Sequence, residues 1–508
     1  MADPAALLGR VHRRFASAPG PAYRCAGGRD LDFGALYQAS AVLAARLMAE
    51  PDAARRRPVV IWGHKDLRYP VAYWACLLAG MALVPVERDT PAGRLRQIVE
   101  QCGAGDVLIA SDADGDLALV QAALQGLPCR IHTVDPAARL AGEAPTPAPR
   151  APGDVAYIMF SSGTLGRPKG IQVTYGNLVD FIHWLPALLP EDGLQAVSGN
   201  IRHCFDVSLF ELWVSWTRLH PLVALDHADF AHSTAYITRL AEAGTGLWVS
   251  TPSITRLMLK NPRFNGQMLP GLRVFLFCGE PLTRQIVAAL FERFPGCRVV
   301  NTYGPTECTV AVTAADITPD HLARPGELPI GAARPGVQLR TSTGAPRGEL
   351  LISGPCVARG YLNQPEKQAH AFPAPDCYRS GDWAEQDAAG DWVFPGRMDR
   401  EVKIQGVRID LNDVEAHIRS QPGVEDVVVE PYVLRGEPRA LNAYVIGDAD
   451  AGALERLARD LAAELPPYLV PRFWYAGFPA VLNANSKLDR SQLSQAADVA
   501  QHRHVHHV

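Results

Sequence analysis

Apolar runs of strand length alternate with helix-like stretches through the first 300 residues of the chain. The run 58–62 is followed by a polar turn, an apolar helix-like stretch over 73–81 and a second apolar run over 82–86. This strand–helix–strand order is typical of a parallel sheet covered by helices. It therefore predicts an α/β body. Similar runs, each next to a helical segment, recur at 106–110, 246–250 and 273–277.

The pattern changes after residue 395, where the predicted elements form a small α+β unit. We expect three domain-level parts: a core over 1–396, a hinge at 397–400 and a small mobile C-terminal domain over 401–508. A ligand would bind in the cleft between the two domains, where such sites are common. The elements predicted for the small domain are strands at 401–405, 424–434 and 441–446, and helices at 412–420 and 451–464.

Composition and charge exclude several classes of protein. The 508 residues carry a formal charge of −4, with a pI near 6.4, which gives no electrostatic footprint for nucleic acid. No apolar run reaches the roughly 18 to 20 residues needed to cross a bilayer. The ten cysteines include no Cys-x-x-Cys pair, so we expect reduced thiols in a cytoplasmic protein. The histidine-rich tail 502–507 is expected to be a solvated, disordered end.

The segment 157–170 is the most informative stretch of the chain. A strand-like run ends in hydroxyls, three glycines and Lys169, a composition that can wrap backbone N–H groups and a cation around phosphates. A proline precedes Lys169 and an apolar run follows it, unlike the helix-opening P-loop. We therefore predict a mobile phosphate loop between two strands. A plain hairpin turn rich in glycine and serine is the alternative.

Four further motifs have the same polar, glycine-rich character. They are Asn301-Thr302-Tyr303-Gly304-Pro305-Thr306-Glu307, Tyr378-Arg-Ser-Gly-Asp382, Gly396-Arg397-Met398-Asp399 and Asn485-Ser-Lys487-Leu-Asp-Arg490. Each is weak alone. In this order, and with the loop at 161–170, they resemble the adenylate-forming superfamily, in particular the adenylation domains that activate amino acids for carrier proteins. The resemblance covers nearly the whole chain.

The resemblance implies an ATP site with Mg²⁺. Thr306 would contact the α-phosphate, Glu307 would hold the metal, and Asp382 would accept the ribose hydroxyls. Tyr303 would stack on adenine, and Asn301 would offer its amide to the adenine edge. Leu165 stands where the family usually has a hydroxyl, so one phosphate contact is expected to be weakened or rearranged. The full set implied for the nucleotide is Ser161, Ser162, Gly163, Thr164, Gly166, Lys169, Asn301, Thr302, Tyr303, Gly304, Asp382, Arg397 and Lys487.

Catalysis and domain movement are also implied by the resemblance. Lys487 would bridge the substrate carboxylate and the α-phosphate, where it would lower the electrostatic barrier between two anions. Asp399 matches the family's hinge, about which the small domain rotates after adenylation. The alternative for Asp399 is a surface salt bridge.

Asp206, in Phe205-Asp206-Val207-Ser208, matches the aspartate that holds the substrate's α-ammonium in amino-acid-activating members. Its alternative is a helix N-cap. The pocket positions implied are Asp206, Val207, Phe210, Ser250, Leu276, Cys278, Gly279, Thr302, Val310, Ala311 and Lys487. Because they form a compact set with one acidic group, they favour a small neutral amino acid.

The segments around Ser250, Cys278 and 301–313 resemble D-alanine–carrier-protein ligases, in which a cysteine at the place of Cys278 is tied to chirality. Val207 and Phe210 replace that subfamily's usual Leu and Met, so D- and L-alanine, glycine, serine and small non-proteinogenic acids all stay open. Only Ser250 and Thr302 offer hydrogen bonds to a hydroxylated substrate.

We expect a stand-alone ligase that loads a separate, acidic carrier protein bearing a phosphopantetheine arm. Basic residues near the hinge would favour docking of that carrier; a solvated basic loop is the alternative. Two other functions stay open: an acyl- or aryl-CoA synthetase, and a non-catalytic nucleotide-binding homologue. The basic candidates are Arg397, Arg400, Lys403 and Arg408.

Overall fold

The structure is a computed structural model. It describes residues 3–50, 56–111, 115–161, 168–226, 232–387, 390–398, 400–424, 426–434, 437–446, 449–477, 500 and 502–506. These residues belong to two compact units. The first comprises Met1–Arg88, Val99–Phe160 and Gly170–Met398, and the second Asp89–Ile98, Ser161–Lys169 and Asp399–Val508. The second unit thus includes two short N-terminal segments together with the C-terminal residues. The predicted division at 396–401 assigned both segments to the core.

A mixed sheet of seven strands builds part of the first unit. β3, β4, β5, β6 and β7 run parallel, and the short β18 pairs antiparallel with β8 at one edge. In sheet order the strands are β18 (Gly360–Tyr361), β8 (Lys169–Thr174), β7 (Val155–Ser161), β4 (Leu83–Glu87), β3 (Val59–Gly63), β5 (Asp106–Ala110) and β6 (Arg130–Thr133).

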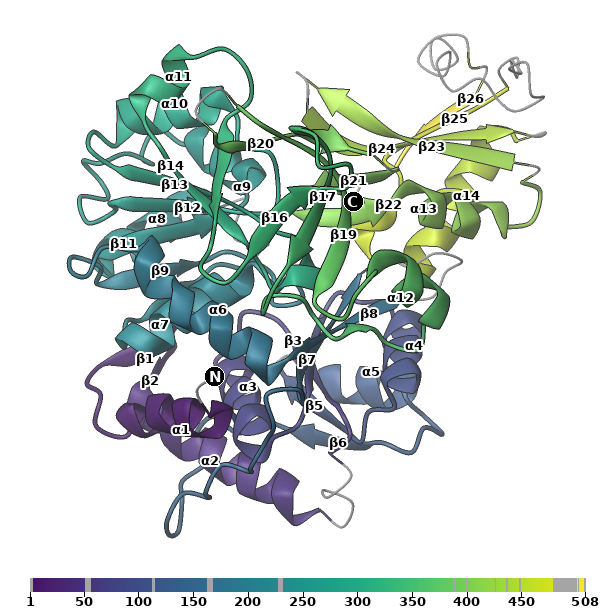
Figure 1. The fold of residues 1–508 in the computed structure, drawn as a ribbon. Helices are drawn as coiled ribbons and strands as arrows, with labels where there is room; N and C mark the ends of the chain where they lie inside the picture. The colour runs from purple at the N-terminus through teal and green to yellow at the C-terminus, as the bar shows by residue number, and fades with distance from the viewer. Residues whose placement is uncertain are drawn as a thin grey trace. The chain divides into compact units, whose positions relative to one another are not determined.

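Burial explains why the centre of this sheet is almost wholly apolar. Every residue of β3 is buried, as expected for a parallel strand covered on both faces. Gly63 is required there because a Cβ at that position would lie 2.3 Å from the carbonyl oxygen of Ala110. The helices α1 (Pro4–Phe15), α2 (Phe33–Ala49) and α3 (Arg68–Ala79) pack against one another, and α3 contacts β3 and β5 (Figure 1).

A second sheet of thirteen strands carries most of the candidate site. Taken in sheet order, the strands from β1 to β13 run parallel and those from β13 to β16 run antiparallel. The edge strand β2 pairs antiparallel with β1. In order they are β16 (Gln338–Thr341), β17 (Arg347–Ser353), β19 (Cys377–Gln386), β20 (Trp392–Arg397), β15 (Pro329–Ala333), β14 (Thr313–Ile317), β13 (Arg298–Tyr303), β12 (Val274–Phe277), β11 (Thr245–Ser250), β9 (Ala196–Gly199), β10 (Leu222–Ala224), β1 (Pro21–Arg24) and β2 (Asp30–Asp32).

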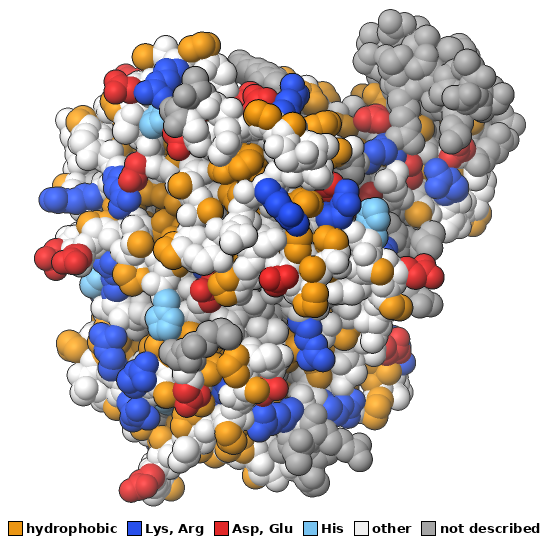
Figure 2. All heavy atoms as spheres, in the orientation of Figure 1, with side chains coloured by type: hydrophobic (Ala, Val, Ile, Leu, Met, Phe, Trp, Pro, Cys, Tyr) orange, Lys and Arg blue, Asp and Glu red, His pale blue; other side chains and the backbone are white. Residues whose placement is uncertain are grey.

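The other helices of the N-terminal part follow the strands along the chain. They are α4 (Ala92–Cys102), α5 (Asp116–Ala123), α6 (Tyr175–Leu188), α7 (Ser208–Arg218), α8 (Ser233–Glu242), α9 (Pro252–Leu259), α10 (Arg284–Arg293), α11 (Pro319–Ala323) and α12 (Pro365–Ala371). The predicted α/β body is therefore confirmed. On the face that Figure 2 shows, acidic and basic side chains are interspersed, as the near-neutral composition predicts.

The C-terminal residues form an α+β arrangement of their own. A two-stranded ladder precedes a four-stranded sheet. Asp410 caps α13 by accepting a hydrogen bond from the N–H of Asn412 (2.9 Å). The elements are β21 (Glu401–Ile404), β22 (Val407–Asp410), α13 (Leu411–Arg419), β23 (Asp426–Leu434), β24 (Glu437–Ile446), α14 (Ala451–Glu464), β25 (Phe473–Ala476) and β26 (His502–Val505).

Three local expectations were wrong. Helix α3 begins at Arg68, not at 73, because the Asp66 carboxylate accepts the Arg68 N–H and the following residues are buried. Strand β24 begins at Glu437, not at 441, because its ladder with β23 extends to the Leu434–Glu437 pair. The tail 502–505 is not a disordered end but the strand β26, which pairs with β25.

No helix in the described part of the chain is long and apolar enough to cross a membrane.

Trp74 is the centre of the aromatic cluster that joins α1, α3 and α7. Its buried indole meets Phe15, Trp213 and Trp216 edge to face, with ring centroids 5.1, 5.7 and 5.2 Å away. Trp74→Ala is expected to destabilise the first unit by about 3–5 kcal/mol, since it removes a large buried ring and leaves a cavity. Differential scanning calorimetry measures this as a lower melting temperature. Leu119→Ala, at a side chain that is 47% exposed, is the control; equal melting temperatures for both variants would contradict the cluster's role.

Candidate functional site

The carboxyl ends of three parallel strands bring the predicted pocket residues to one edge of the large sheet. Ser250 ends β11, Cys278 follows β12 and Asn301 to Tyr303 end β13. The register pairs Ser250 with Phe277 and Phe277 with Asn301. This edge of a parallel sheet is where α/β proteins commonly bind ligands. Leu276 lies one residue back from this edge and is fully buried in β12, while Gly279 follows Cys278 with a positive φ of 96°.

The polar side chains at this edge are bonded to the backbone. The Ser250 hydroxyl donates to the Thr251 carbonyl (2.6 Å), and the Thr302 hydroxyl donates to the Phe277 carbonyl (2.7 Å). The Cys278 thiol lies 3.7 Å from the Val310 carbonyl oxygen, to which it donates. Because both hydroxyl protons are committed, neither hydroxyl is positioned as a donor to a substrate.

The turn after β13 places Val310 and Ala311 against the same edge. Thr309 and Val310 have positive φ angles of 57° and 70°, and the Ala311 N–H donates to the Thr309 carbonyl (2.9 Å) across a γ-turn. Such angles are strained for β-branched residues, at roughly 1–3 kcal/mol each. The Thr309 hydroxyl secures the turn by donating to the Cys356 carbonyl (2.8 Å). Gly304 is needed because a Cβ there would lie 2.5 Å from the Ala311 Cα.

Asp382 is the centre of a buried polar group on β19. Its carboxylate accepts hydrogen bonds from the Tyr303 hydroxyl and from the Arg397 guanidinium, the latter at 2.5 Å. Burial and the charge of Asp382 raise the pKa of Tyr303 well above its usual value, so the phenol stays protonated and donates. The Tyr303 ring lies against Phe394, with centroids 5.7 Å apart. An ionised, oriented carboxylate of this kind is suited to accept hydroxyl groups from a ligand.

The Asn301 amide is engaged in the fold. Its Nδ2 donates to the Pro329 carbonyl (2.8 Å), which links β13 to β15, and its side chain is buried. This bond uses one of the two amide protons. The predicted contact of Asn301 with adenine stays a prediction.

Glu307 lies in the short 3₁₀ turn Thr306–Cys308 and is fully buried, whereas Thr306 is half-buried. Its Oε1 accepts a hydrogen bond from the Tyr361 hydroxyl (2.8 Å). No cluster of three or more His, Cys, Asp or Glu side chains is present among the described residues. Mg²⁺ is usually held by one or two carboxylates together with substrate phosphates. A single carboxylate at Glu307 is compatible with this mode of coordination.

Asp206 precedes α7 and is buried, with 7% of its surface exposed. Val207 occupies the N-cap position of α7, so the alternative of Asp206 as the N-cap is wrong. Burial and the Asp206 charge raise the pKa of Tyr157 well above its usual value, which places the carboxylate near that phenol. Phe210 fills volume behind it and meets Phe181 edge to face, with centroids 5.1 Å apart.

Sequence reasoning missed two buried side chains near these positions. Arg334 is almost fully buried and its guanidinium pairs with Asp180 at 2.9 Å. Its backbone N–H donates a hydrogen bond to the Val312 carbonyl. Tyr361 contacts Glu307 as described above. No local sequence pattern predicts either contact, because Asp180 and Glu307 lie far along the chain from Arg334 and Tyr361.

Several predicted residues lie outside the described part of the chain. Ser161 ends β7 and Lys169 begins β8, and these two strands are neighbours in the sheet, as a loop between two strands requires. The roles of the residues in between, of the hinge and of the catalytic lysine stay predictions. Those outside the description are Ser162, Gly163, Thr164, Leu165, Gly166, Asp399 and Lys487.

The basic residues expected to dock a carrier are largely engaged in ion pairs. Arg400 contacts Glu415 at 2.8 Å and Glu430 at 3.2 Å. Arg408 pairs with Glu401, and Arg397 with Asp382 as above. These contacts favour a structural role over a solvated basic loop. They do not support a docking patch at these arginines.

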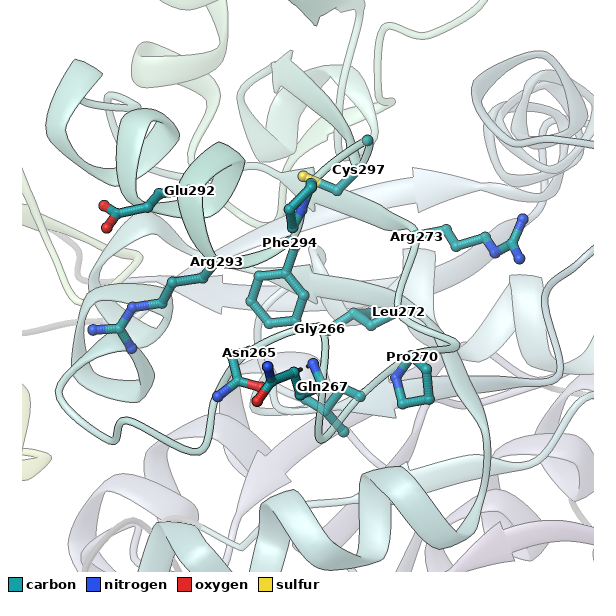
Figure 3. A pocket seen from close by; sticks show the side chains of 13 residues that line it. Asn265, Gly266, Gln267, Pro270, Leu272, Arg273, Glu292, Arg293, Phe294 and Cys297 are labelled. Carbon is teal, nitrogen blue, oxygen red and sulfur yellow. Dashed lines mark hydrogen bonds between the residues drawn. The ribbon is translucent and has the colours of Figure 1, made fainter.

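A pocket of about 690 Å³ lies at the opposite edge of the parallel strands. It is lined in part by Arg273 and Cys297, which come immediately before β12 and β13. Figure 3 shows the Phe294 ring among its lining residues and the charged ends of Glu292 and Arg293 pointing outward. This pocket is therefore separate from the candidate site.

Comparisons with known proteins identify the family. The family described as AMP-binding enzyme matches residues 12–362. A D-alanine–D-alanyl carrier protein ligase of Bacillus licheniformis is 30% identical over 490 residues, covering 92% of this chain and 95% of the relative. The corresponding ligase of Bacillus anthracis is 32% identical over 459 residues, covering 86% and 89%.

Solved structures share the fold. The Vibrio cholerae adenylation domain AlmE, in complex with glycyl-adenosine-5'-phosphate, has a TM-score of 0.81 and 23% identity, covering 98% of both chains. The o-succinylbenzoate CoA synthetase MenE of Bacillus subtilis has a TM-score of 0.78 and 19% identity, covering 96% and 98%. The family match and the sequence similarity show that the chain belongs to the AMP-binding enzyme family of adenylate-forming ligases.

Proposed function

We propose that this chain activates a small neutral amino acid, with alanine as the first candidate. The amino acid's carboxylate attacks the α-phosphate of ATP, giving an aminoacyl-adenylate and pyrophosphate. The aminoacyl group then passes to the phosphopantetheine thiol of a separate carrier protein, with release of AMP. The relatives that are 30–32% identical to this chain are named as D-alanine–D-alanyl carrier protein ligases, and these names support the proposal.

The observation that carries the proposal is the buried carboxylate of Asp206. A charge in such a position is costly unless a cation or hydrogen-bond donors balance it. The α-ammonium of an amino acid supplies both. Asp206 is the one acidic group in the predicted set of pocket residues, and a carboxylic acid without an amine would bring no cation to it.

The remaining pocket residues favour a short apolar side chain. Phe210 and Cys278 are buried, and the γ-turn holds Val310 and Ala311 in place. The Ser250 and Thr302 hydroxyls both donate to backbone carbonyls. Alanine and glycine need no further partner, whereas serine would bring a hydroxyl without a positioned donor to meet it. An apolar site discriminates against an added hydroxyl by up to about 100-fold.

We expect the nucleotide to bind through the motif residues. Asp382 would accept the ribose hydroxyls, while Tyr303 and Arg397 hold that carboxylate in orientation. Glu307 would hold Mg²⁺, which when bound supplies positive charge to the phosphates. Lys487 would hold the two anions together at the reacting phosphorus. Lys169 and the loop before it would bind the departing pyrophosphate.

Amino-acid-dependent ATP–pyrophosphate exchange tests the proposal. We expect exchange with alanine, weaker exchange with glycine, and at least about ten-fold lower kcat/KM with serine. Comparing the D and L forms of alanine assigns the chirality. If simple carboxylates stimulate exchange and amino acids do not, the chain is a CoA ligase or a related enzyme and the proposal is wrong.

Asp206→Ala is expected to raise the KM for the amino acid by about 100-fold or more, because the substrate ammonium loses its buried counter-charge. The KM for ATP should stay within about two-fold, since Asp206 does not belong to the nucleotide residues. Steady-state exchange kinetics measure both values. Asp316→Asn, at a side chain that is 54% exposed, is the control. A loss confined to the ATP KM would contradict the assignment.

Lys487→Ala is expected to reduce adenylation by a factor on the order of 10³, since the group that brings two anions together is removed. Thioester formation from supplied aminoacyl-adenylate should fall far less, because that half-reaction no longer joins those anions. Exchange and carrier-loading assays measure the two steps separately. Equal losses in both steps would argue against distinct conformations for the two half-reactions.

A further inference from the structure

Residues 356–362 connect two parts of the candidate site that lie far apart in the sequence. On one side they pair with β8, the strand that directly follows the predicted phosphate loop. The Arg359 N–H donates to the Gln172 carbonyl (2.9 Å), and the Leu362 N–H donates to the Gly170 carbonyl (2.8 Å). The short strand β18 within this segment continues the same ladder.

On the other side the segment holds the turn that contains Glu307. The Ala358 N–H donates to the Glu307 carbonyl (2.8 Å), and the Cys356 carbonyl accepts from the Thr309 hydroxyl (2.8 Å). The first bond holds the backbone of the turn at Glu307, and the second holds the residue Thr309 that follows the turn. A third bond, from the Tyr361 hydroxyl to Glu307 Oε1 (2.8 Å), reaches the carboxylate itself.

Tyr361 is itself firmly held. Its N–H donates to Gln368 Oε1 (2.7 Å), from α12. Its ring meets Phe372 edge to face, with centroids 5.3 Å apart, and Phe372 in turn contacts Tyr378 at 5.1 Å. The side chain is 9% exposed. The hydroxyl is therefore a donor fixed in space, not a mobile one.

We propose that Tyr361 is a positioning residue that orients the Glu307 carboxylate toward the metal held with ATP. A hydrogen bond to one carboxylate oxygen restricts rotation of the group and so sets where the other oxygen points. Because Tyr361 also belongs to the ladder with β8, it ties that orientation to the strand that carries the phosphate loop. The inference rests on the proposed role of Glu307 in holding Mg²⁺, but not on the choice of amino acid.

The phenol suits this role better than a charged donor would. A lysine or arginine in its place would neutralise Glu307 and compete with the metal for it. A neutral hydroxyl leaves the carboxylate its charge. Its oxygen is also of the kind that Mg²⁺ and the waters bound to Mg²⁺ accept as a neighbour.

Tyr361→Phe tests the proposal, because it removes the hydroxyl and keeps the ring that packs on Phe372. The readout is the rise in melting temperature that ATP causes without amino acid, measured across a range of Mg²⁺ concentrations. We expect the variant to need about ten-fold more Mg²⁺ for half of that rise, as for other groups that support a metal-binding side chain. The concentration of Mg²⁺ that gives half-maximal exchange should shift by a similar factor, with little change in the amino-acid KM.

Thr309→Val is the matched control. It removes a hydrogen bond of the same length from the same turn, keeps a β-branched side chain, and leaves the carboxylate untouched. We expect it to lower the melting temperature without changing the Mg²⁺ dependence. Identical shifts in Mg²⁺ dependence for Thr309→Val and Tyr361→Phe would reduce Tyr361 to a general support of the turn and overturn the proposal.

Two further outcomes are decisive. An unchanged Mg²⁺ curve for Tyr361→Phe, or an ATP effect on the wild-type protein that is independent of Mg²⁺, would also overturn it. Failure of the proposed substrate class shows differently: the wild-type protein would respond to ATP and Mg²⁺ but no amino acid would stimulate exchange. The two ideas therefore fail separately.

Discussion

The alignment of β11, β12 and β13 is the constraint on which the candidate site depends. Their parallel register brings Ser250, Phe277 and Asn301 level with one another, so the chain leaves all three strands at one edge. The next strand, β14, runs antiparallel to β13, and the chain must therefore reverse within the residues after Tyr303. That reversal accounts for the requirement for Gly304 and for the positive φ angles of Thr309 and Val310. The strain is offset by bonds such as that from the Thr309 hydroxyl to Cys356.

The arrangement of buried charge follows from the same edge. The Asp382 carboxylate is held by a neutral phenol and a guanidinium, whereas the Glu307 carboxylate is held by the neutral Tyr361 hydroxyl. A carboxylate that already pairs with arginine can accept hydroxyl groups, but it is a poor ligand for a cation. A hydrogen bond from a neutral donor such as the Tyr361 hydroxyl does not cancel the charge that a cation needs. The difference in partners thus agrees with a ribose role for Asp382 and a metal role for Glu307.

Local pattern predicted much of the fold and little of the detail within the site. The predicted strand 106–110 and helix 451–464 match β5 and α14 residue for residue. The spacing of apolar residues within each segment is enough to predict where the element begins and ends. The start of α3 escaped prediction because a side-chain hydrogen bond from the Arg68 N–H to Asp66 and the burial of the following residues decide it. The strand β26 escaped because a distant partner strand decides it. Tyr361 and Glu307 are 54 residues apart, and nothing in a single sequence pairs them. The motifs located Glu307; the residue that orients it became visible only with the fold.

Substrate choice is the property that the fold determines least. The same architecture is found in a glycine-adenylate complex and in a CoA synthetase, so the sheets and their edge cannot select the acid. Selection must lie in the side chains around the substrate, and the proposed function assigns two of them to different points of it. Asp206 is the proposed counter-charge for the substrate's ammonium. Cys278, whose thiol contacts the carbonyl of the strained Val310, links the pocket wall to a backbone that has little freedom to move. A larger side chain at Cys278 would have to displace the γ-turn, and with it the segment that leads back to Glu307. Cys278 is therefore coupled, through the strained residues Thr309 and Val310, to the residue proposed to hold the metal.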